Sequence, residues 1–228
     1  MLFIGLDDTD TLESRGTGHL ARQIAGVLAA DYRVLGVTRH QLLEDPRVPC
    51  TKKNSCAAIA LNGNGDVDVD GLVARVRQMM LEDFQPGSDP GLCVAQAVPD
   101  VVTAFGRRVQ QHIVAQSEAR DLAATYQIPL LGLGGTEDGV IGALAAVGLA
   151  ASGEDGRYVL VGRSRELGGL RTVSEVLETG IAAVQTQAGV PVVDGLVQTD
   201  KLRPARRGSR PIAVVEWTGE YWLPLKLD

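Results

Sequence analysis

Cysteine is scarce in this chain of 228 residues, which contains only Cys50, Cys56 and Cys93. An odd number of cysteines without a C-x-x-C pair argues against a disulfide framework and against a zinc site. No apolar run reaches the length that spans a bilayer, and the N-terminus lacks the basic and apolar regions of a signal peptide. Aromatic residues make up only 4% of the chain, so we expect a core of Val, Leu, Ala and Ile. These absences predict a cytoplasmic globular protein that does not bind a membrane.

Positive charge is also in short supply, because 22 Lys and Arg stand against 28 Asp and Glu and give a net charge of −6. A broad nucleic-acid surface needs Lys and Arg to neutralise phosphates, so the composition argues against one. Basic residues do gather at Lys52-Lys53, at Arg107-Arg108 and from Arg203 to Arg210. We interpret the last group as a solvated loop and keep RNA binding as the alternative.

An apolar segment of strand length near the N-terminus leads directly into Asp7, Asp8 and Asp10. Three carboxylates this close repel one another and need a compensating charge. Mg²⁺ bound by oxygen ligands and by substrate phosphates would supply it. The alternative is an acidic turn in which Asp10 or Ser14 caps the following helix. We favour the metal site because a helix cap needs one carboxylate and this segment has three.

A helix is predicted after the acidic segment, since Leu20, Ile24 and Leu28 recur at helical spacing. Thr17 and Gly18 lie near its start, where free backbone N–H groups and the helix dipole favour a phosphate. The sequence therefore places a predicted metal site next to a predicted anion site.

A glycine-rich segment with the sequence LLGLGGTEDGVIGALAAVGLAA begins at Leu130. It predicts a short strand, a turn and an Ala-rich helix. Gly139 and Gly142 leave backbone N–H groups unshielded at the helix start, which suits a phosphate or a nucleotide. Close helix packing selects the same residues, and the segment matches neither a Walker A loop nor a G-x-G-x-x-G motif. The residues alone do not separate these two explanations.

Strand and helix patterns alternate along the chain and predict an α/β (α+β) fold. We expect strands at 34–37, 56–61, 92–95 and 157–162, a turn over 62–70 and a helix over 172–187. Two final strands, at 211–217 and 221–227, indicate a hairpin. The predicted organisation is one domain over residues 1–205 and a β-hairpin extension over 206–228 packed on the same domain.

Four motifs in one order resemble a known family. The motifs IGLDDTD, VPCTKKNSCAA, DPG and DGVIGALAAVG are similar to those of the kinase-like (THUMP-like) N-terminal domain of archaeal tRNA-isoleucine agmatinylcytidine synthetase. The resemblance is clear over residues 1–150 and weak to about 205. It implies a kinase-like fold with ATP and Mg²⁺ as cofactors. In that family the enzyme uses ATP to activate a cytosine of the tRNA anticodon and then joins agmatine to it.

The resemblance also implies roles for individual residues. Asp7, Asp8 and Asp10 would face Mg²⁺ and the ATP phosphates, with Asp8 catalytic. Lys53 would stabilise the charge that develops on the transferred phosphoryl group, as phosphoryl transfer requires. The remaining positions implied to bind the nucleotide are Thr17, Gly18, Lys52, Asn54, Gly139 and Gly142.

Two departures from the family bear on the acceptor. Asp138 stands where the family has an arginine, which removes a cation from the implied phosphate site. The family enzyme continues into a ferredoxin-like domain, an oligonucleotide-binding fold and a zinc ribbon, and this chain ends before all three. With a net charge of −6, these departures favour a small-molecule acceptor over tRNA.

We therefore expect a Mg-ATP-binding phosphotransferase or ligase that phosphorylates or ATP-activates a small-molecule acceptor not identified by the sequence. A tRNA-modifying enzyme similar to the synthetase and a non-catalytic nucleotide-binding module remain alternatives. A haloacid-dehalogenase-like phosphohydrolase is a further alternative, although Leu12 stands where its pattern needs Thr or Val. The sequence leaves the oligomeric state open.

Overall fold

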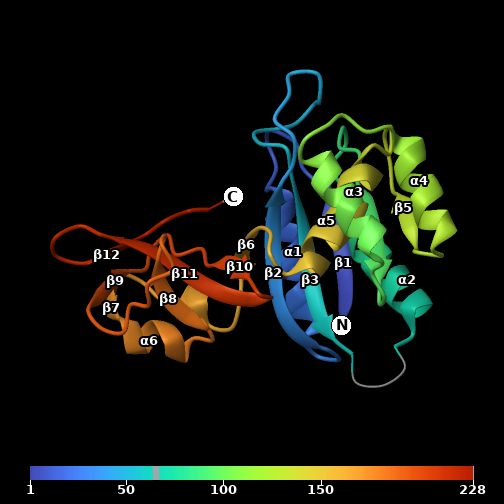
Figure 1. Cartoon of the computed structure of the whole chain (residues 1–228). Coiled ribbons are helices and arrows are strands. Elements are labelled where there is room, and N and C mark those ends of the chain that lie inside the picture. Colours follow the sequence, from blue (N-terminus) through green and yellow to red (C-terminus); the bar gives the residue numbers. More distant parts are fainter. Residues whose placement is uncertain (64–66, 228) are drawn as a thin grey trace. The chain divides into compact units, whose positions relative to one another are not determined.

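The computed structural model describes residues 1–63 and 67–227, and the chain divides into an N-terminal unit, Met1–Ser152, and a C-terminal unit, Gly153–Asp228 (Figure 1). The turn expected over 62–70 lies partly outside the described residues. No helix within the described ranges is long and apolar enough to cross a bilayer. Each unit has its own strands and its own core, and each unit is described by itself.

An antiparallel sheet with the strand order β5-β4-β1-β3-β2 forms the centre of the N-terminal unit. The strands are β1 (Leu2–Asp7), β2 (Arg33–Gln41), β3 (Ser55–Asn62), β4 (Gly91–Ala95) and β5 (Leu130–Gly132). The helices are α1 (Thr17–Leu28), α2 (Val69–Glu82), α3 (Asp100–Val109), α4 (Gln116–Thr125) and α5 (Gly139–Ser152). Helix α5 packs on β1, β3 and β4 and is covered by α3 and α4, whereas α1 contacts β2 and β3 and α2 contacts β4 (Figure 1).

Small residues allow α5 to approach the sheet closely. A Cβ atom on Gly5 of β1 would overlap the carbonyl of Ala143, and a Cβ atom on Gly91 of β4 would overlap the backbone of Gly139. Within α5, a Cβ atom on Gly148 would overlap the carbonyl of Val102 in α3. Because the helix axis lies this near the strands, the core between them consists mainly of Ala, Val and Leu, as the low aromatic content predicts.

Several loops meet at one end of the strands of this sheet because neighbouring strands are antiparallel. Asp7, the last residue of β1, pairs with Gly91, the first residue of β4, and Gly91 also pairs with Gly132 at the end of β5. Gln41 at the end of β2 pairs with Ser55 at the start of β3. Four loops therefore lie at this end of the strands. They are the acidic loop after β1, the loop before β4, the turn before α5 and the loop from β2 to β3.

The C-terminal unit contains the strand order β6-β10-β11-β12-β9-β7, with β8 parallel to β11. Its strands are β6 (Arg157–Leu160), β7 (Leu170–Thr172), β8 (Ala183–Thr186), β9 (Leu196–Gln198), β10 (Ala205–Arg207), β11 (Arg210–Trp217) and β12 (Trp222–Pro224). Two short helical segments, η1 (Ser164–Glu166) and α6 (Val173–Glu178), complete it. The expected C-terminal hairpin is present as the antiparallel pair β11–β12.

Two sequence-based expectations differ from this structure. The helix expected over 172–187 ends at Glu178, and residues 183–186 form β8, because Gly180 has a φ of 100° that breaks the helix and β11 offers a strand partner. The chain divides after Ser152 and not near residue 205, because β8 and β9 pair with β11 and β12 and share a core with them.

Candidate functional site

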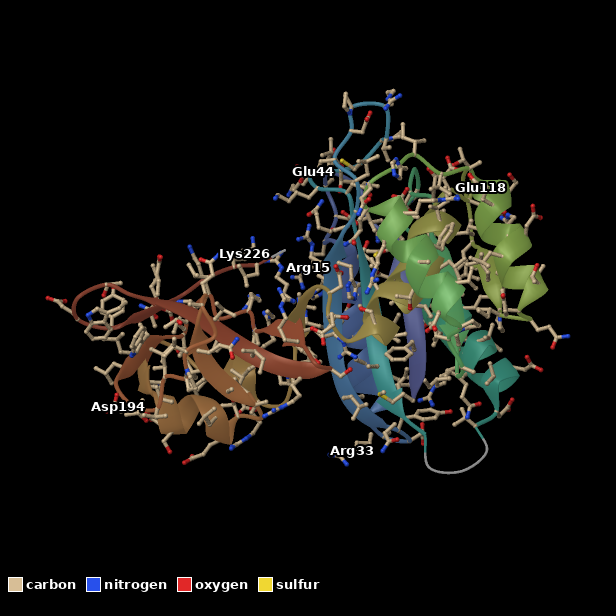
Figure 2. All side chains as sticks on the ribbon, viewed as in Figure 1. Arg15, Arg33, Glu44, Glu118, Asp194 and Lys226 are labelled. Atoms are coloured by element: carbon tan, nitrogen blue, oxygen red, sulfur yellow. The ribbon has the colours of Figure 1, made fainter. Side chains whose placement is uncertain are left out.

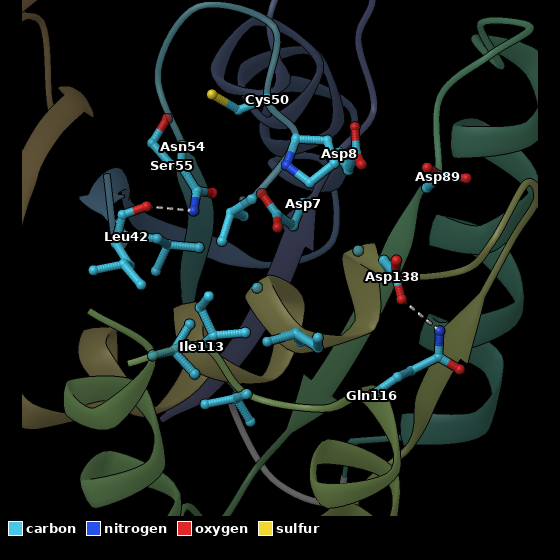
Figure 3. A pocket seen from close by; sticks show the side chains of 18 of the residues that line it. Asp7, Asp8, Leu42, Cys50, Asn54, Ser55, Asp89, Ile113, Gln116 and Asp138 are labelled. Carbon is cyan, nitrogen blue, oxygen red and sulfur yellow. Dashed lines mark hydrogen bonds between the residues drawn. The ribbon is translucent and has the colours of Figure 1, made fainter. Parts of the chain in front are cut away.

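A pocket of about 320 Å³ lies among the loops at this end of the strands of the N-terminal sheet (Figure 3). One wall is acidic and the other is apolar. The acidic wall carries Asp7, Asp8, Asp10, Asp89 and Asp138. The apolar wall carries Leu42, Leu43, Val48, Pro49, Val109, Ile113, Val114 and Ile141.

Asp7 and Asp8 form the centre of the acidic wall. Burial raises the pKa of Asp7 to about 8, and the negative charges of Asp8 and Asp10 add to the effect. Burial also raises the pKa of Asp8 to about 6, with further contributions from the carboxylates of Asp89, Asp10 and Asp138. Asp8 has a φ of 50°, in the left-handed region that residues other than Gly rarely adopt. The turn thus holds a strained acidic residue next to a half-buried one whose charged form is disfavoured, and a bound cation would stabilise both carboxylates in their charged form.

Asp10 has a different environment because both of its carboxylate oxygens accept hydrogen bonds. Its Oδ1 accepts from the backbone N–H of Thr17 at 3.2 Å and from the Thr17 hydroxyl at 3.0 Å, and its Oδ2 accepts from the Thr51 hydroxyl at 3.0 Å. The Thr17 hydroxyl in turn accepts from the hydroxyl of Thr9 at 3.1 Å. Asp10 therefore bonds to the first residue of α1 and joins the acidic loop to the β2–β3 loop. This is close to the capping alternative, and it engages the hydroxyl that the sequence assigned to a phosphate.

The first backbone N–H groups of α5 donate hydrogen bonds to carbonyl groups of the protein. Gly139 N–H donates to the carbonyl of Asp89 at 3.0 Å, and Ile141 N–H donates to the carbonyl of Asp138 at 3.1 Å. Gly142 lies against the Asp7 carboxylate, which occupies the space that a Cβ atom would need. Close packing accounts for the glycines at both positions, and their role in phosphate binding stays a prediction.

Lys53 and Arg47 are the cationic residues among the described ones that line the pocket. The Lys53 ammonium lies 3.8 Å from the carboxylate of Glu44, which is labelled in Figure 2, and its side chain is 52% exposed. Arg47 pairs with Asp45 at 2.7 Å. Lys53 is therefore loosely held and able to turn toward a phosphate.

Three further residues that the sequence assigned to nucleotide binding lie as follows. Asn54 lines the pocket, but its side-chain amide donates to the carbonyl of Leu43 at 2.8 Å and so braces the loop (Figure 3). Gly18 and Lys52 are not among the described residues that line the pocket.

The apolar wall was not expected from the sequence. The β2–β3 loop and the end of α3 are joined by the backbone hydrogen bond from Leu43 to Val109 at 3.3 Å and by the Gln110 side chain, which donates to the carbonyl of Gln41 at 3.0 Å. Val109 and Ile113 follow a helical pattern that reads as core packing, so spacing alone could not indicate a pocket. An apolar slot next to a few polar groups is the usual environment of a bound ring system.

The residues present fit a magnesium ion that arrives together with a nucleotide. Within residues 1–63 and 67–227 no group of three or more His, Cys, Asp or Glu is arranged to hold a metal. Mg²⁺ is commonly bound by one or two carboxylates together with substrate phosphates, and it selects oxygen ligands. Asp7 and Asp8 offer two such carboxylates, whereas both oxygens of Asp10 are engaged by threonines.

No family model and no curated protein matches the chain. Solved structures do match. A tRNA fluorescent labeling enzyme and a complex of TiaS with an isoleucine tRNA and ATP are each 25% identical to the chain with a TM-score of 0.56. Each match covers 64% of this chain, but only 35% of the first structure and 36% of the second. The apo form of TiaS, a tRNA agmatidine synthetase, is 24% identical with a TM-score of 0.54 and supports the fold alone.

These matches overturn one sequence-based expectation. A small-molecule acceptor was favoured over tRNA because of the acidic composition, but the TiaS structure that matches at 25% identity is a complex with an isoleucine tRNA and ATP. Net charge did not reveal this, because it averages over the whole surface and contains no information on local sites. Over 64% of its length, the chain is thus structurally similar to tRNA agmatidine synthetase, as the four sequence motifs imply.

Proposed function

We propose that the chain binds Mg-ATP in this pocket and acts in the ATP-dependent modification of a tRNA. The observation that carries the proposal is the pairing of a half-buried acidic wall, centred on Asp7 and Asp8, with an apolar wall in one pocket. The structural similarity to the TiaS complex that contains ATP and an isoleucine tRNA supports the same function.

The acidic wall suits a metal-bound triphosphate better than a free one. Five carboxylates line the pocket against two cationic side chains, so an ATP anion without a metal would be repelled. A bound Mg²⁺ would supply the positive charge that lets the phosphates enter and would neutralise charge during transfer. Asp7 and Asp8 would hold it, and the apolar wall would receive the adenine ring.

The chain's own residues would then support phosphoryl transfer. The γ-phosphoryl group would pass from ATP to an oxygen atom of the RNA, with ADP as the leaving group, and the phosphorylated RNA would be the activated form. Lys53 is exposed at the pocket and would turn from Glu44 toward the transferred group. Asp10 would hold the acidic loop and α1 in place through Thr17 and Thr51.

Asp8→Asn tests the nucleotide site. We expect Mg-ATP to raise the melting temperature of the wild-type protein by mass action, and we expect this shift to disappear in the variant. Asp121→Asn in α4 is the matched control, because Asp121 is exposed and does not line the pocket. An unchanged Mg-ATP shift in Asp8→Asn would refute the metal site.

Transfer of labelled γ-phosphate from ATP to total tRNA then tests the activity. Labelled tRNA that depends on Asp8 supports the enzyme. A protein that binds Mg-ATP but labels no tRNA is the non-catalytic nucleotide-binding module, for which Asp138 in place of the family's arginine is the supporting residue.

A further inference from the structure

Arg165 and Arg203 lie side by side in the C-terminal unit. Strands β6 and β10 are antiparallel with Arg157 opposite Ala205, and Tyr158 N–H donates to the carbonyl of Pro204 at 2.7 Å. Continued by two residues, this register sets Val159 opposite Arg203. The guanidinium group of Arg165, which extends from η1, donates to the carbonyl of Val159 at 3.1 Å. Arg165 therefore bonds to the residue that lies opposite Arg203, and its positive charge acts on Arg203.

Neither arginine has a carboxylate partner among the described residues. Within the described part of the chain, Arg203 donates to the carbonyl of Leu202, at 2.7 Å, and Arg165 donates to that of Val159. Among the described residues of the N-terminal unit, by contrast, ion pairs with Asp or Glu are formed by Arg47, Arg75, Arg108 and Arg120. Burial and the positive charge of Arg165 lower the pKa of Arg203. Two like charges held together in this way are stabilised by a bound anion.

The remainder of the basic run does not extend this pair into a continuous patch. Arg206 is 3% exposed, donates to the Tyr158 hydroxyl at 2.7 Å and lies over the Tyr158 ring at 5.8 Å, so it belongs to the interior. Arg207 donates to the carbonyls of Glu154 and Arg206. The run from Arg203 to Arg210 thus contains arginines that bond within the protein interior and arginines whose guanidinium groups can bind a ligand. The sequence alone could not distinguish the two kinds.

We propose that Arg165 and Arg203 form a clamp for neighbouring phosphates of an RNA backbone. The inference rests on the proposed function for its ligand, tRNA, and adds the surface that binds it. Most donors of the two guanidinium groups remain unused, and guanidinium groups match phosphate oxygens in geometry and charge. Two adjacent cations suit consecutive phosphodiesters, and contacts to phosphates position a nucleic acid without reading its bases.

The double variant Arg165→Gln/Arg203→Gln tests the clamp by filter binding to total tRNA, without nucleotide, at several salt concentrations. Each phosphate contact contributes roughly 0.7 to 0.9 to the slope of log affinity against log salt, so we expect the slope to fall by about 1.5. At low salt the affinity should fall by about tenfold or more. Arg171→Gln/Arg210→Gln is the control, because it removes the same charge from two exposed arginines of the same unit.

Three outcomes would overturn the clamp. The first is an unchanged slope in Arg165→Gln/Arg203→Gln, and the second is an equal loss in both double variants, which would indicate diffuse surface charge. The third is a melting-temperature shift by inorganic phosphate that depends on the two arginines while tRNA binding does not, which would indicate a free-phosphate site. Absence of any Mg-ATP shift in the wild-type protein would instead refute the proposed function and leave the clamp testable, since the tRNA titration needs no nucleotide. Melting curves of each variant confirm that it is folded.

Discussion

At the scale of single residues, the half-buried Asp7 carboxyl links the site to stability. Its pKa is about 8 in the folded protein against a usual value of 3.8, because burial disfavours the charged form. The folded state therefore binds a proton that the unfolded state releases between these values, and the free energy of unfolding of the nucleotide-free protein falls as the pH rises from about 4 to 8. The stabilising contribution of the Asp7 proton is therefore fully present below the lower pKa and is lost as the pH rises above the upper one.

Asp7→Asn removes this titration, so we expect a flatter dependence of stability on pH than in the wild type. The difference should be largest near pH 8, where the variant is relatively more stable. Urea unfolding at three pH values without nucleotide measures it. Parallel pH profiles of the two proteins would contradict the burial of an uncompensated carboxyl at this position.

Lys53 provides the second prediction at this scale. Lys53→Ala should lower the rate of phosphate transfer more than it lowers the affinity for Mg-ATP, because a loosely held ammonium acts on charge that develops in the transition state. Lys52→Ala is the matched control, since Lys52 does not line the pocket. Equal small effects of both variants would make Lys53 an ordinary surface residue.

The sequence indicated Asp7, Asp8 and Asp10 because they are neighbours in the chain. It did not indicate that Asp89 and Asp138 join them, because that contact depends on the pairing of β1 with β4 and on the position of α5. It also could not show that Asp10 is engaged by Thr17 and Thr51, one of which is far away in the sequence. Local spacing finds a cluster of charges, and only the tertiary structure assigns each charge a partner.

At the scale of elements, the glycines of α5 determine how closely it packs. Gly148→Ala places a Cβ atom against the carbonyl of Val102, so we expect it to lower the free energy of unfolding by about 1–3 kcal/mol. Gly26→Ala in α1 is the control, because nothing lies within 4 Å of a Cβ atom there. The control should be neutral or stabilise by up to about 1 kcal/mol, as alanine favours a helix.

Thermal and urea unfolding of both variants measure the difference. Equal effects of Gly148→Ala and Gly26→Ala would mean that α5 does not need the close approach. Since Gly148 does not line the pocket, a change in its variant reports on packing and not on ligand binding.

The elements that the sequence predicted well are those with a regular pattern over many residues, such as α1, β3 and α5. The helix expected over 172–187 failed because the apolar spacing continues through Gly180, whose φ of 100° no helix tolerates. The short strands β7, β9 and β10 each have three residues, which is too few for a period to be recognised.

At the scale of the whole molecule, the two units have separate cores. The core around α5 contains residues between Phe3 and Ala151, and the core around β11 contains residues between Leu167 and Trp222. Sequence reasoning set the boundary near residue 205 because the family resemblance fades there. The strand pairings that hold the second unit together are invisible to such motifs, since they involve short strands distant in sequence.

These separate cores predict that residues 1–152 fold when expressed alone and keep the melting-temperature shift with Mg-ATP. All residues that line the pocket lie between Asp7 and Gly142, and so do the carboxylates that would hold the metal. The fragment lacks Arg165 and Arg203, so its tRNA affinity should depend less steeply on salt than that of the full chain. Calorimetry with Mg-ATP and filter binding with tRNA, each run beside the full chain, measure both properties. A folded fragment without the Mg-ATP shift would contradict the assignment of the nucleotide site to this pocket, because the fragment keeps every residue that lines it.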